Sequence, residues 1–331
     1  MGPACTLTTE VSPIKYRQLG RSGLRVSAYA LGTNAFGVRA DEAASIAVIH
    51  HALDHGVNLI DTANIYTETR SETIIGKALN GRRVQAIVAT KCGMRTGAGP
   101  NDESSSRWHI MREIEGSLRR LQTDYIDLYQ IHRFDGLTPV EETLRAFDDL
   151  IRRGSVRYIG CSNFAAWQVC KALWMSDRYG LPRYECVQPA YSPADRRIET
   201  ELVPLCLDQG VGLIVYFPLA GGILTGKYKP GAQPPQGSRA DKQPAFARRI
   251  NEQNLVLVRD MERLAVETGT TVAQLTLAWV MNRPGITSAI VGATRVAQQE
   301  ENLKSVDLEL SAEVMDRINE ISQPFVTLPG W

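Results

Sequence analysis

The sequence of 331 residues lacks an apolar run long enough to span a bilayer. The longest charge-free stretch of note, residues 211–226, is interrupted by Pro218 and several glycines, whereas a membrane-spanning helix needs about 20 apolar residues. The first residues also lack a basic segment followed by an apolar core, so we expect no signal peptide. These absences predict a protein without a membrane partner.

Neither sign of charge is in excess. The 37 Lys and Arg residues against 36 Asp and Glu residues give a formal net charge of +1, which argues against a basic surface for nucleic acid. Cysteine is scarce too, because the six cysteines show no C-x-x-C spacing. This pattern favours reduced, buried thiols over a disulfide framework or a zinc site. We therefore expect a cytoplasmic protein with no bound metal.

The chain also lacks a G-x-G-x-x-G segment after any apolar run, which argues against a Rossmann domain. A different unit recurs in it: a helical stretch ends at glycine, a short apolar run follows, and a polar loop comes next. Gly56, Gly154 and Gly210 mark three such units, since glycine suits the left-handed turn after a helix. Eight strands are predicted in all, at residues 28–31, 57–61, 86–90, 126–131, 156–161, 186–188, 213–216 and 288–291.

Strands that alternate with helices pair in parallel, in a doubly wound sheet or a closed (β/α)8 barrel. Eight units favour the TIM barrel, with its core at about residues 28–305, in a single domain of residues 1–331. We expect an N-terminal β-hairpin at residues 16–25 and an extra C-terminal helix at residues 312–321. The Pro- and Gly-rich residues 229–244 fit either an interdomain linker or a loop over the barrel mouth. The loop is favoured because an eighth strand still follows.

Helix starts carry recognisable capping signals. Asp41 and Ser71 are candidate N-caps of the helices after the first and second strands. Capping boxes are predicted at Thr138 and at Thr271. In the first of these, Pro139 would take the first helical position.

Three consecutive predicted strands end in residues that can do chemistry. Asp61 ends the second strand, Lys91 the third and His132 the fourth, and Tyr66 lies five residues beyond the acid. In a barrel, functional groups project from the carboxyl ends of the strands. We therefore expect these four side chains to meet at one rim.

These residue types suit a site that moves a proton to or from an oxygen. The pKa of a free tyrosine is near 10, and a nearby ammonium stabilises the phenolate and pulls that pKa down. A carboxylate keeps the lysine charged, and a histidine N–H can orient a carbonyl oxygen. The set contains no obvious nucleophile, so a cofactor must supply the other half of the reaction.

The chain resembles an aldo-keto reductase in Asp61-Thr-Ala-x-x-Tyr66, in Ala-Thr-Lys91-Cys-Gly and in Gln-Ile-His132-Arg. The resemblance implies NADPH-dependent reduction of an aldehyde or ketone to an alcohol, in a reversible hydride transfer. It gives Tyr66 the role of general acid, tuned by Lys91 together with Asp61, while His132 orients the carbonyl.

The same resemblance implies a nicotinamide cofactor, NADP with NAD possible. The cofactor-binding residues that it implies run from the start of the barrel to its last helix: Gly32, Thr33, Asp61, Ser162, Asn163, Gln188, Tyr216, Phe217, Leu219, Gly221, Lys227, Arg239, Gly292, Thr294, Gln298, Glu301 and Asn302. Among them, Ser162, Asn163 and Gln188 would bind the carboxamide, and Tyr216 would stack on the nicotinamide. Leu219 and Gly221 match the family's pyrophosphate loop, and Arg239 resembles a clamp on the cofactor. The residues from Gly292 to Asn302 resemble the adenosine end of the site, at the start of the last barrel helix. Two residues depart from the family pattern, since Phe217 stands where many relatives have serine and Gly292 where some have lysine. Arg239, Thr294 or Arg295 would then have to contact the 2′-phosphate.

The expected partner is a small-molecule carbonyl or alcohol substrate, and a homo-oligomer is possible. Candidate substrate contacts, besides Tyr66 and His132, are Asn34, Trp108 in the loop after the third strand, Arg133 and the C-terminal Trp331. The sequence also resembles the potassium-channel β-subunit branch of the superfamily. A nicotinamide-binding redox-sensing or regulatory subunit with little turnover is therefore the alternative to an enzyme.

Overall fold

Eight parallel strands close into a barrel in the computed structural model, which describes residues 14–236 and 238–326. Consecutive strands are neighbours throughout, and β10 closes the ring against β3. The strands are β3 (Tyr29–Gly32), β4 (Leu59–Asp61), β5 (Ile87–Cys92), β6 (Ile126–Ile131), β7 (Val156–Ser162), β8 (Cys186–Gln188), β9 (Gly212–Val215) and β10 (Ile286–Gly292). The predicted TIM barrel is confirmed, with each predicted strand within two residues of an observed one.

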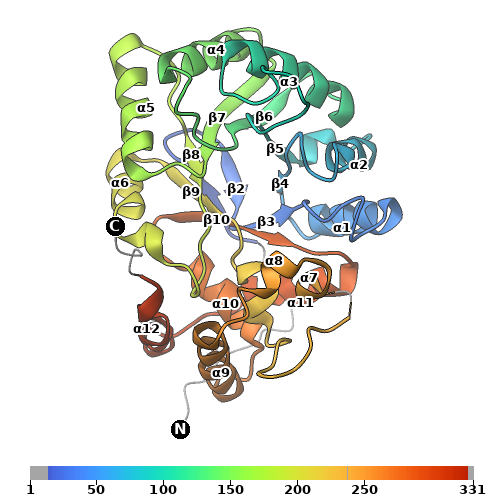
Figure 1. The fold of residues 1–331 in the computed structure, drawn as a ribbon, viewed down its shortest axis with the longest axis vertical. Coiled ribbons are helices and arrows are strands. Elements are labelled where there is room, and N and C mark those ends of the chain that lie inside the picture. Colours follow the sequence, from blue (N-terminus) through green and yellow to red (C-terminus); the bar gives the residue numbers. More distant parts are fainter. Residues whose placement is uncertain (1–13, 237, 327–331) are drawn as a thin grey trace.

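An outer ring of helices covers the barrel (Figure 1). It consists of α1 (Glu42–Asp54), α2 (Arg70–Ala78), α3 (Arg107–Leu121), α4 (Val140–Arg152), α5 (Ala166–Tyr179), α6 (Leu202–Gln209), α10 (Val272–Met281) and α11 (Val296–Leu303). The glycines predicted to end helices, Gly56, Gly154 and Gly210, all have positive φ. Their lack of a Cβ allows the chain to reverse there into the next strand.

Two of the four predicted caps are confirmed. Asp41 accepts a hydrogen bond from the amide of Ala44, and Thr271 forms a complete capping box with Gln274. The other two are wrong. Ser71 lies inside α2, and its hydroxyl bonds to the hydroxyls of Thr33 and Thr62. The Thr138 hydroxyl donates to Asp135. Pro139 consequently takes the N-cap position of α4 without a side-chain hydrogen bond.

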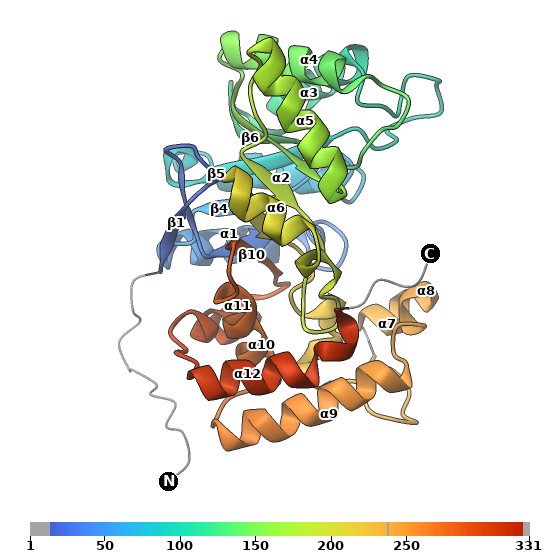
Figure 2. The same ribbon diagram turned by 90° about the vertical axis from the view of Figure 1, so that its left-hand side faces the viewer.

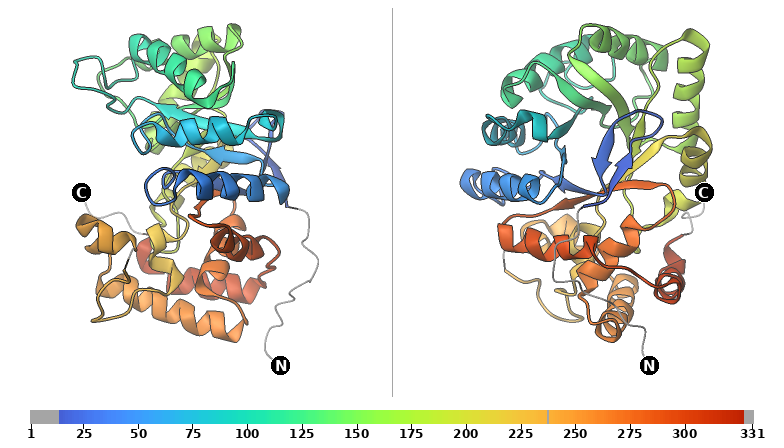
Figure 3. Two further views of the ribbon diagram at one scale, coloured as in Figure 1. Left: turned by 90° about the vertical axis from the view of Figure 1, so that its right-hand side faces the viewer. Right: turned by 180° about the vertical axis from the view of Figure 1, so that it is seen from behind.

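The amino ends of the barrel strands are covered by the predicted hairpin of β1 (Tyr16–Gln18) and β2 (Arg25–Ser27), which crosses the barrel in Figure 3. Leu19 and Val26 of this hairpin are fully buried. They pack with side chains from inside the barrel: Ala30, Leu59, Ala89, Leu128, Cys186, Ile214 and Ile290. We call these nine residues the bottom plug. It fills this end of the barrel with apolar side chains and one thiol.

The chain between β9 and β10 is more structured than the long loop expected from sequence. It contains α7 (Arg239–Lys242), α8 (Pro244–Ala247) and α9 (Glu252–Glu267) before the barrel helix α10. The predicted C-terminal helix is α12 (Ala312–Ile321), which packs against α9. Figure 2 shows α7 and α8 at the end of the molecule opposite the hairpin. None of the helices in the described ranges is both long and apolar enough to cross a membrane.

The remaining helical turns are short 3-10 segments: Arg83–Gln85, Arg197–Glu199, Ala220–Thr225, Lys304–Val306 and Gln323–Phe325. Cys92, Cys161, Cys186 and Cys206 are buried free thiols, as predicted. Cys170 is free but exposed on α5, so the expectation of burial is wrong there. Cys5 and Trp331 lie outside the described residues.

Candidate active site

The four predicted catalytic residues meet at the carboxyl ends of β4, β5 and β6. Lys91 Nζ donates to Asp61 Oδ1 at 2.6 Å and to the carbonyl oxygen of Thr62 at 2.7 Å. It also lies 3.4 Å from the Tyr66 hydroxyl. The Tyr66 and His132 rings meet edge to face with 5.7 Å between their centroids. The barrel thus joins four side chains that are separated by as many as 71 residues in sequence (61 to 132).

The Asp61–Lys91 ion pair is almost inaccessible to solvent, with 0% of Lys91 and 3% of Asp61 exposed. Burial disfavours the ammonium, but the Asp61 carboxylate and Tyr66 outweigh it and raise the pKa of Lys91. Burial raises the pKa of Asp61, although Lys91 and Gln188 act in the opposite direction. Because its pKa is raised, Lys91 stays charged at neutral pH beside Tyr66.

The pKa of Tyr66 is raised, because burial of the phenol outweighs the positive charge of Lys91. Lys91 does lower that pKa, as the sequence predicts, but the net direction is upward. The hydroxyl consequently keeps its proton at neutral pH. When the proton leaves, the phenolate that forms is beside a charged ammonium.

His132 is held as a neutral imidazole. Burial, together with the charges of Lys91 and Arg133, lowers its pKa to about 3. Its backbone is fixed on both sides, since its N–H donates to Cys92 and its carbonyl accepts from the Asn163 side chain. The buried Nδ1 has no hydrogen-bond partner among the described residues. A neutral ring at this place can donate a hydrogen bond to a substrate oxygen without adding a charge.

The residues predicted for the nicotinamide end form one hydrogen-bonded set with Asp61. Gln188 Nε2 donates to Asp61 Oδ1 at 2.8 Å, and the Ser162 hydroxyl donates to the Gln188 carbonyl at 2.8 Å. The Tyr216 hydroxyl donates to Asn163 Oδ1 at 2.7 Å. Asn163 has a φ of 57°, which is uncommon for a residue other than glycine. These contacts bring the ends of β7, β8 and β9 to the ion pair.

The predicted pyrophosphate loop begins at Phe217 and has an unusual backbone. Phe217 and Ala220 have φ values of 58° and 50°, and Gly221 and Gly222 have 71° and 107°. Leu219 lies between them and accepts from the amide of Gly222. Successive left-handed residues turn backbone N–H groups toward one side, which is typical of anion-binding segments.

Two predicted cofactor cations lie beside this loop. The Arg239 guanidinium packs over the rings of Phe217 and Phe246 at 5.1 and 5.6 Å. Burial, together with Arg39 and Arg249, lowers its pKa to about 10, and its buried Nε lacks a hydrogen-bond partner. A Cβ added to Gly221 would lie 3.1 Å from the Arg239 guanidinium, and one added to Gly222 3.0 Å from the Lys227 ammonium. Both cations thus face the pyrophosphate loop.

The predicted adenosine end gathers around the start of α11. The amide and hydroxyl of Thr294 both donate to Gln298, and Arg295 precedes the helix without making a side-chain cap. The Asn302 side chain is buried beside Tyr29. Glu301, in contrast, bonds to Gln274 and Lys304, so its carboxylate is already engaged.

The residues at the end of β3, the first barrel strand, support the site without adding a charge to it. The Thr33 hydroxyl donates to the Asp61 carbonyl at 2.8 Å. Gly32 pairs in register with Gly292 of β10. A Cβ at Gly32 would lie 2.7 Å from Ile290, so only glycine fits there without a shift.

Comparison with known proteins agrees with this geometry. The profile of the Aldo/keto reductase family matches residues 29–323. The chain belongs to this family. It is 38% identical to the uncharacterized oxidoreductase YrpG of Bacillus subtilis, over 93% of this chain and 96% of that protein.

Two further relatives of this aldo/keto reductase carry different kinds of name. A probable voltage-gated potassium channel subunit beta of Arabidopsis thaliana is 39% identical over 94% of this chain and 97% of its own length. Versiconal hemiacetal acetate reductase of Aspergillus parasiticus is 32% identical over 96% and 99%. Relatives of similar length therefore include both a named reductase and a named channel subunit.

The predicted substrate contacts of this aldo/keto reductase are more dispersed than the four predicted catalytic residues. Asn34 is exposed after β3 and accepts from Arg39. Arg133 is exposed and pairs with Glu103 at 3.1 Å. The prediction that Trp108 lies in the loop after β5 is wrong. Trp108 is the second residue of α3, with 66% of its surface exposed. A role of these three residues in substrate binding stays a prediction.

Sequence reasoning missed three polar residues near the mouth. Arg39 is close enough to Arg239 to lower its pKa, and Asn64 and Glu113 bond to each other behind Tyr66. Asn64 lies within the motif that carries Asp61 and Tyr66, which is the one local signal that could have found it. Glu113 looks like any other acid on a helix. In the described ranges, no group of three His, Cys, Asp or Glu residues could hold a metal ion.

Proposed function

We propose that this aldo/keto reductase catalyses the NADPH-dependent reduction of an aldehyde or ketone to an alcohol, with Tyr66 as general acid. The observation that carries the proposal is the position of Lys91 Nζ, 2.6 Å from Asp61 Oδ1 and 3.4 Å from the Tyr66 hydroxyl. A buried cation held beside a partly buried phenol is arranged to stabilise the phenolate that proton donation leaves. The reaction is reversible, so the same phenolate accepts a proton in alcohol oxidation.

The residues of the mouth fit a nicotinamide dinucleotide. Asn163, Gln188 and Tyr216 form a connected amide and phenol set beside Asp61. The buried Arg239 Nε has no partner in the described part of the chain, and its guanidinium faces a loop with four left-handed residues. An anionic group would satisfy both features. When bound, the cofactor supplies the hydride that the protein's own side chains cannot.

The protein's residues then have separate tasks. Tyr66 donates the proton to the carbonyl oxygen, and its raised pKa keeps it protonated until that step. Lys91 stabilises the resulting phenolate, and Asp61 keeps Lys91 charged and in place. Neutral His132 donates a hydrogen bond to the same oxygen and so fixes the direction of the carbonyl.

Substitution Tyr66→Phe tests this proposal. It removes only the hydroxyl, so we expect the variant to fold and to bind NADPH while kcat falls by about 100- to 10,000-fold. Turnover of a panel of sugars, steroids, simple aldehydes and quinones is measured together with NADPH binding by tryptophan fluorescence. The matched control is Tyr129→Phe, which removes the hydroxyl of a fully buried tyrosine in β6. Wild-type turnover in Tyr66→Phe would assign the acid elsewhere.

The alternative is a regulatory subunit that binds a nicotinamide cofactor with little turnover. The channel-subunit name of one relative makes it worth the same assay. Cofactor release slower than about one per minute, and turnover limited to that rate for every carbonyl, would favour the regulator, since typical enzymes turn over roughly 1 to 1,000 times per second. Turnover in that ordinary range would favour the reductase, and the neutral, positioned His132 supports this second outcome.

We also propose that residues 1–331 form a single domain and that the protein acts in the cytoplasm. Its partner there is a small carbonyl or alcohol substrate. Homo-oligomerisation stays a prediction, which sedimentation of the purified protein would test.

A further inference from the structure

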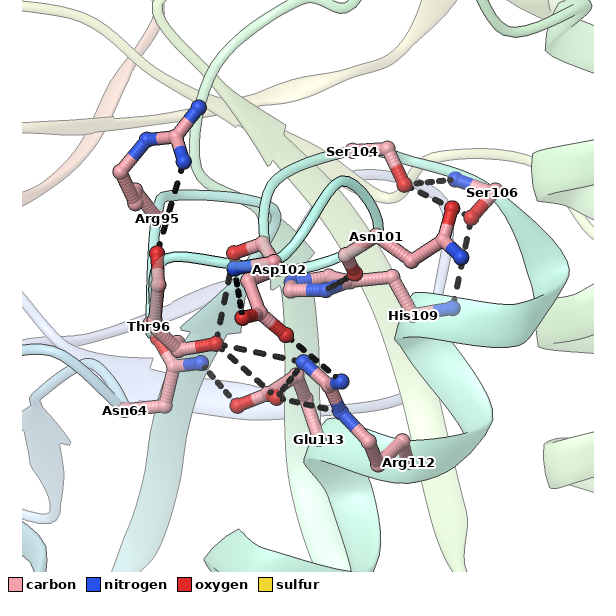
Figure 4. A network of polar contacts seen from close by, with 12 residues as sticks. Asn64, Arg95, Thr96, Asn101, Asp102, Ser104, Ser106, His109, Arg112 and Glu113 are labelled. Atoms are coloured by element: carbon pink, nitrogen blue, oxygen red, sulfur yellow. Dashed lines mark hydrogen bonds and ion pairs between the residues drawn. The ribbon is translucent and has the colours of Figure 1, made fainter.

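One loop connects the segments that carry Tyr66 and His132. The chain between β5 and α3, residues 93–106, is here called the β5–α3 loop. Its Glu103 pairs with Arg133, the residue after His132, at 3.1 Å. Its Thr96 bonds to Glu113 of α3 and its Asp102 pairs with Arg112 of α3, and Glu113 also accepts from Asn64 in the turn before Tyr66 (Figure 4). The loop follows directly from Lys91, so it is attached to the whole catalytic set.

Glu113 on α3 connects the two sides of this network with its two carboxylate oxygens. Oε2 accepts from Asn64 Nδ2 at 2.8 Å. Oε1 accepts from the Thr96 hydroxyl at 3.3 Å and from the Arg112 guanidinium at 3.0 Å. Arg112 in turn pairs with Asp102 at 2.8 Å. Glu113 is only 9% exposed and Asn64 is fully buried, so water does not readily replace these contacts.

The turn that carries Tyr66 needs such support. Thr67, Glu68 and Thr69 directly after it have φ values of 50°, 57° and 71°. Non-glycine residues in this region are costly and persist only where their surroundings hold them. The far side of the turn is held by the Thr67 hydroxyl, which donates to the carbonyl of Phe36. On the near side, Asn64 is held by its backbone bond to Lys91 and by its side-chain bond to Glu113.

We propose that Glu113 is a positioning residue with two separable effects: through Asn64 it sets the place of the Tyr66 hydroxyl, and through Arg112 and Thr96 it holds the β5–α3 loop closed beside the substrate. The inference rests on the proposed role of Tyr66. Oε2 then governs kcat, because it acts on the proton donor. Oε1 governs KM, because it acts on a loop next to the mouth and leaves the donor in place.

The first test is a double-mutant cycle. Glu113→Ala and Asn64→Ala should each lower kcat by about 10- to 100-fold, since a displacement of about 1 Å in a reacting group has an effect of this size. The double variant should lose no more kcat than Glu113→Ala alone, because both changes remove the same hydrogen bond. The dissociation constant of NADPH should stay within about twofold of that of the wild type, because effects at separate sites without shared partners are nearly independent.

The second test separates the two oxygens. Glu113→Gln keeps a hydrogen bond to Asn64. The Asn64 Oδ1 has no partner among the described residues, so the Asn64 amide can rotate by half a turn and accept a hydrogen bond from the new glutamine N–H. The same change weakens the contact with Arg112. We therefore expect near wild-type kcat with a several-fold rise in KM. Arg112→Met should give the same split, because it breaks only the loop side.

The control is Asp127→Asn at the opposite end of the barrel. Asp127 pairs with Arg83 at 2.6 Å and accepts from the amide of Val88, so it matches Glu113 as a partly buried carboxylate on arginine. This variant should keep the kcat and KM of the wild type. Equal losses in Asp127→Asn and Glu113→Ala would reduce Glu113 to a general stabiliser and overturn the inference.

The remaining outcomes separate this inference from the proposed function. Inactive Tyr66→Phe with wild-type kcat in both Glu113→Ala and Asn64→Ala overturns the positioning role and leaves the acid in place. Additive losses in the double variant also overturn it. Active Tyr66→Phe removes the proposed acid, whatever Glu113 does. If Glu113→Ala does not fold, Asn64→Ala and Glu113→Gln still decide the question.

Discussion

The two ends of the barrel are built on opposite principles. At the amino ends of the strands, the bottom plug joins Leu19 and Val26 to seven side chains from inside the barrel, and of these nine only Cys186 carries a polar hydrogen. At the carboxyl ends lie a buried ion pair, an unpartnered imidazole nitrogen and an unpartnered guanidinium nitrogen. One end is filled and satisfied, and the other is polar and incomplete.

Backbone conformation divides the ends in the same way. Seven non-glycine residues of the described chain have positive φ, and only Gln122, which caps α3, is not in a segment that follows a barrel strand at the mouth. The other six are Thr67, Glu68, Thr69, Asn163, Phe217 and Ala220. Strained backbone and unsatisfied polar atoms cost stability, so they persist where a ligand uses them. The apolar packing at the amino end stabilises the fold and offsets this loss of stability at the mouth.

Breaking the ion pair should be the most severe change at the mouth. Lys91→Met leaves Asp61 as a buried, uncompensated carboxylate, so we expect the free energy of unfolding to fall by about 3–5 kcal/mol. We also expect kcat to fall by at least about 100-fold, because the phenolate of Tyr66 loses its cation. Urea unfolding and steady-state kinetics measure the two effects. The double variant Lys91→Met/Asp61→Asn should regain stability without regaining turnover; wild-type stability in Lys91→Met would contradict a charged Asp61.

Truncating the bottom plug should affect stability alone. Leu19→Ala opens a cavity at a fully buried site and should lower the free energy of unfolding by about 2–5 kcal/mol. Its kcat should match that of the wild type, since the catalytic residues lie at the other end of the strands. Leu24→Ala, in the same hairpin but only partly buried, is the milder control. A fall in kcat at a temperature where Leu19→Ala is fully folded would show that the two ends are coupled.

Removing the arginines predicted to bind the cofactor at the mouth should change the affinity for the cofactor rather than the stability of the fold. Arg239 faces the pyrophosphate loop, so Arg239→Ala should weaken NADPH and NADH alike, by about 1.5–3 kcal/mol or roughly ten- to hundredfold. Arg295 adjoins Thr294 at the start of α11, so Arg295→Ala should weaken only NADPH, by removing a contact to the 2′-phosphate.

Titration of tryptophan fluorescence with each cofactor measures these losses. Arg157→Ala is the control, because Arg157 stacks on Tyr125 near the amino end of β7. Equal dissociation constants of NADPH and NADH in the wild type would refute the preference for NADP.

The smallest expected effect is a pH dependence from His132. Its pKa of about 3 in the folded protein lies below the value of about 6.5 in the unfolded chain. Between these values the unfolded chain binds the extra proton, so the folded protein loses stability as the pH falls from 6.5 toward 3. Between pH 6 and pH 5 this amounts to about 1 kcal/mol. His132→Gln should lose less stability than the wild type by that amount in urea unfolding, and parallel losses would mean that His132 is charged in the fold.

Much of the fold could be predicted because its signals are local. A glycine that ends a helix, an apolar run and a polar loop lie within a few residues of each other, so eight strands and the hairpin could be read from the chain. The meeting of the four proposed catalytic residues could be predicted for the same reason, since Asp61, Lys91 and His132 each mark a strand end. Once the strands are parallel, their ends meet.

The predictions that failed depend on partners distant in sequence. Ser71 and Thr138 have the chemistry of caps, but Thr33, Thr62 and Asp135 occupy their hydroxyls. Cys170 is apolar enough for a core, yet α5 turns it outward. Residue type fixes which bonds a side chain is able to make, and packing decides which of them it makes.

The sequence alone determined the barrel, the two additions at its ends and the four residues that meet at its mouth, because periodicity and strand ends are properties of neighbouring residues. Only the tertiary structure decided the electrostatics and the support of that mouth. The pKa of Tyr66 rises because burial outweighs Lys91, and that of His132 falls for want of water. Glu113 reaches Asn64 across 49 residues because two helical and loop segments are packed together. Desolvation and long-range contact depend on the whole fold, so no local pattern contains them.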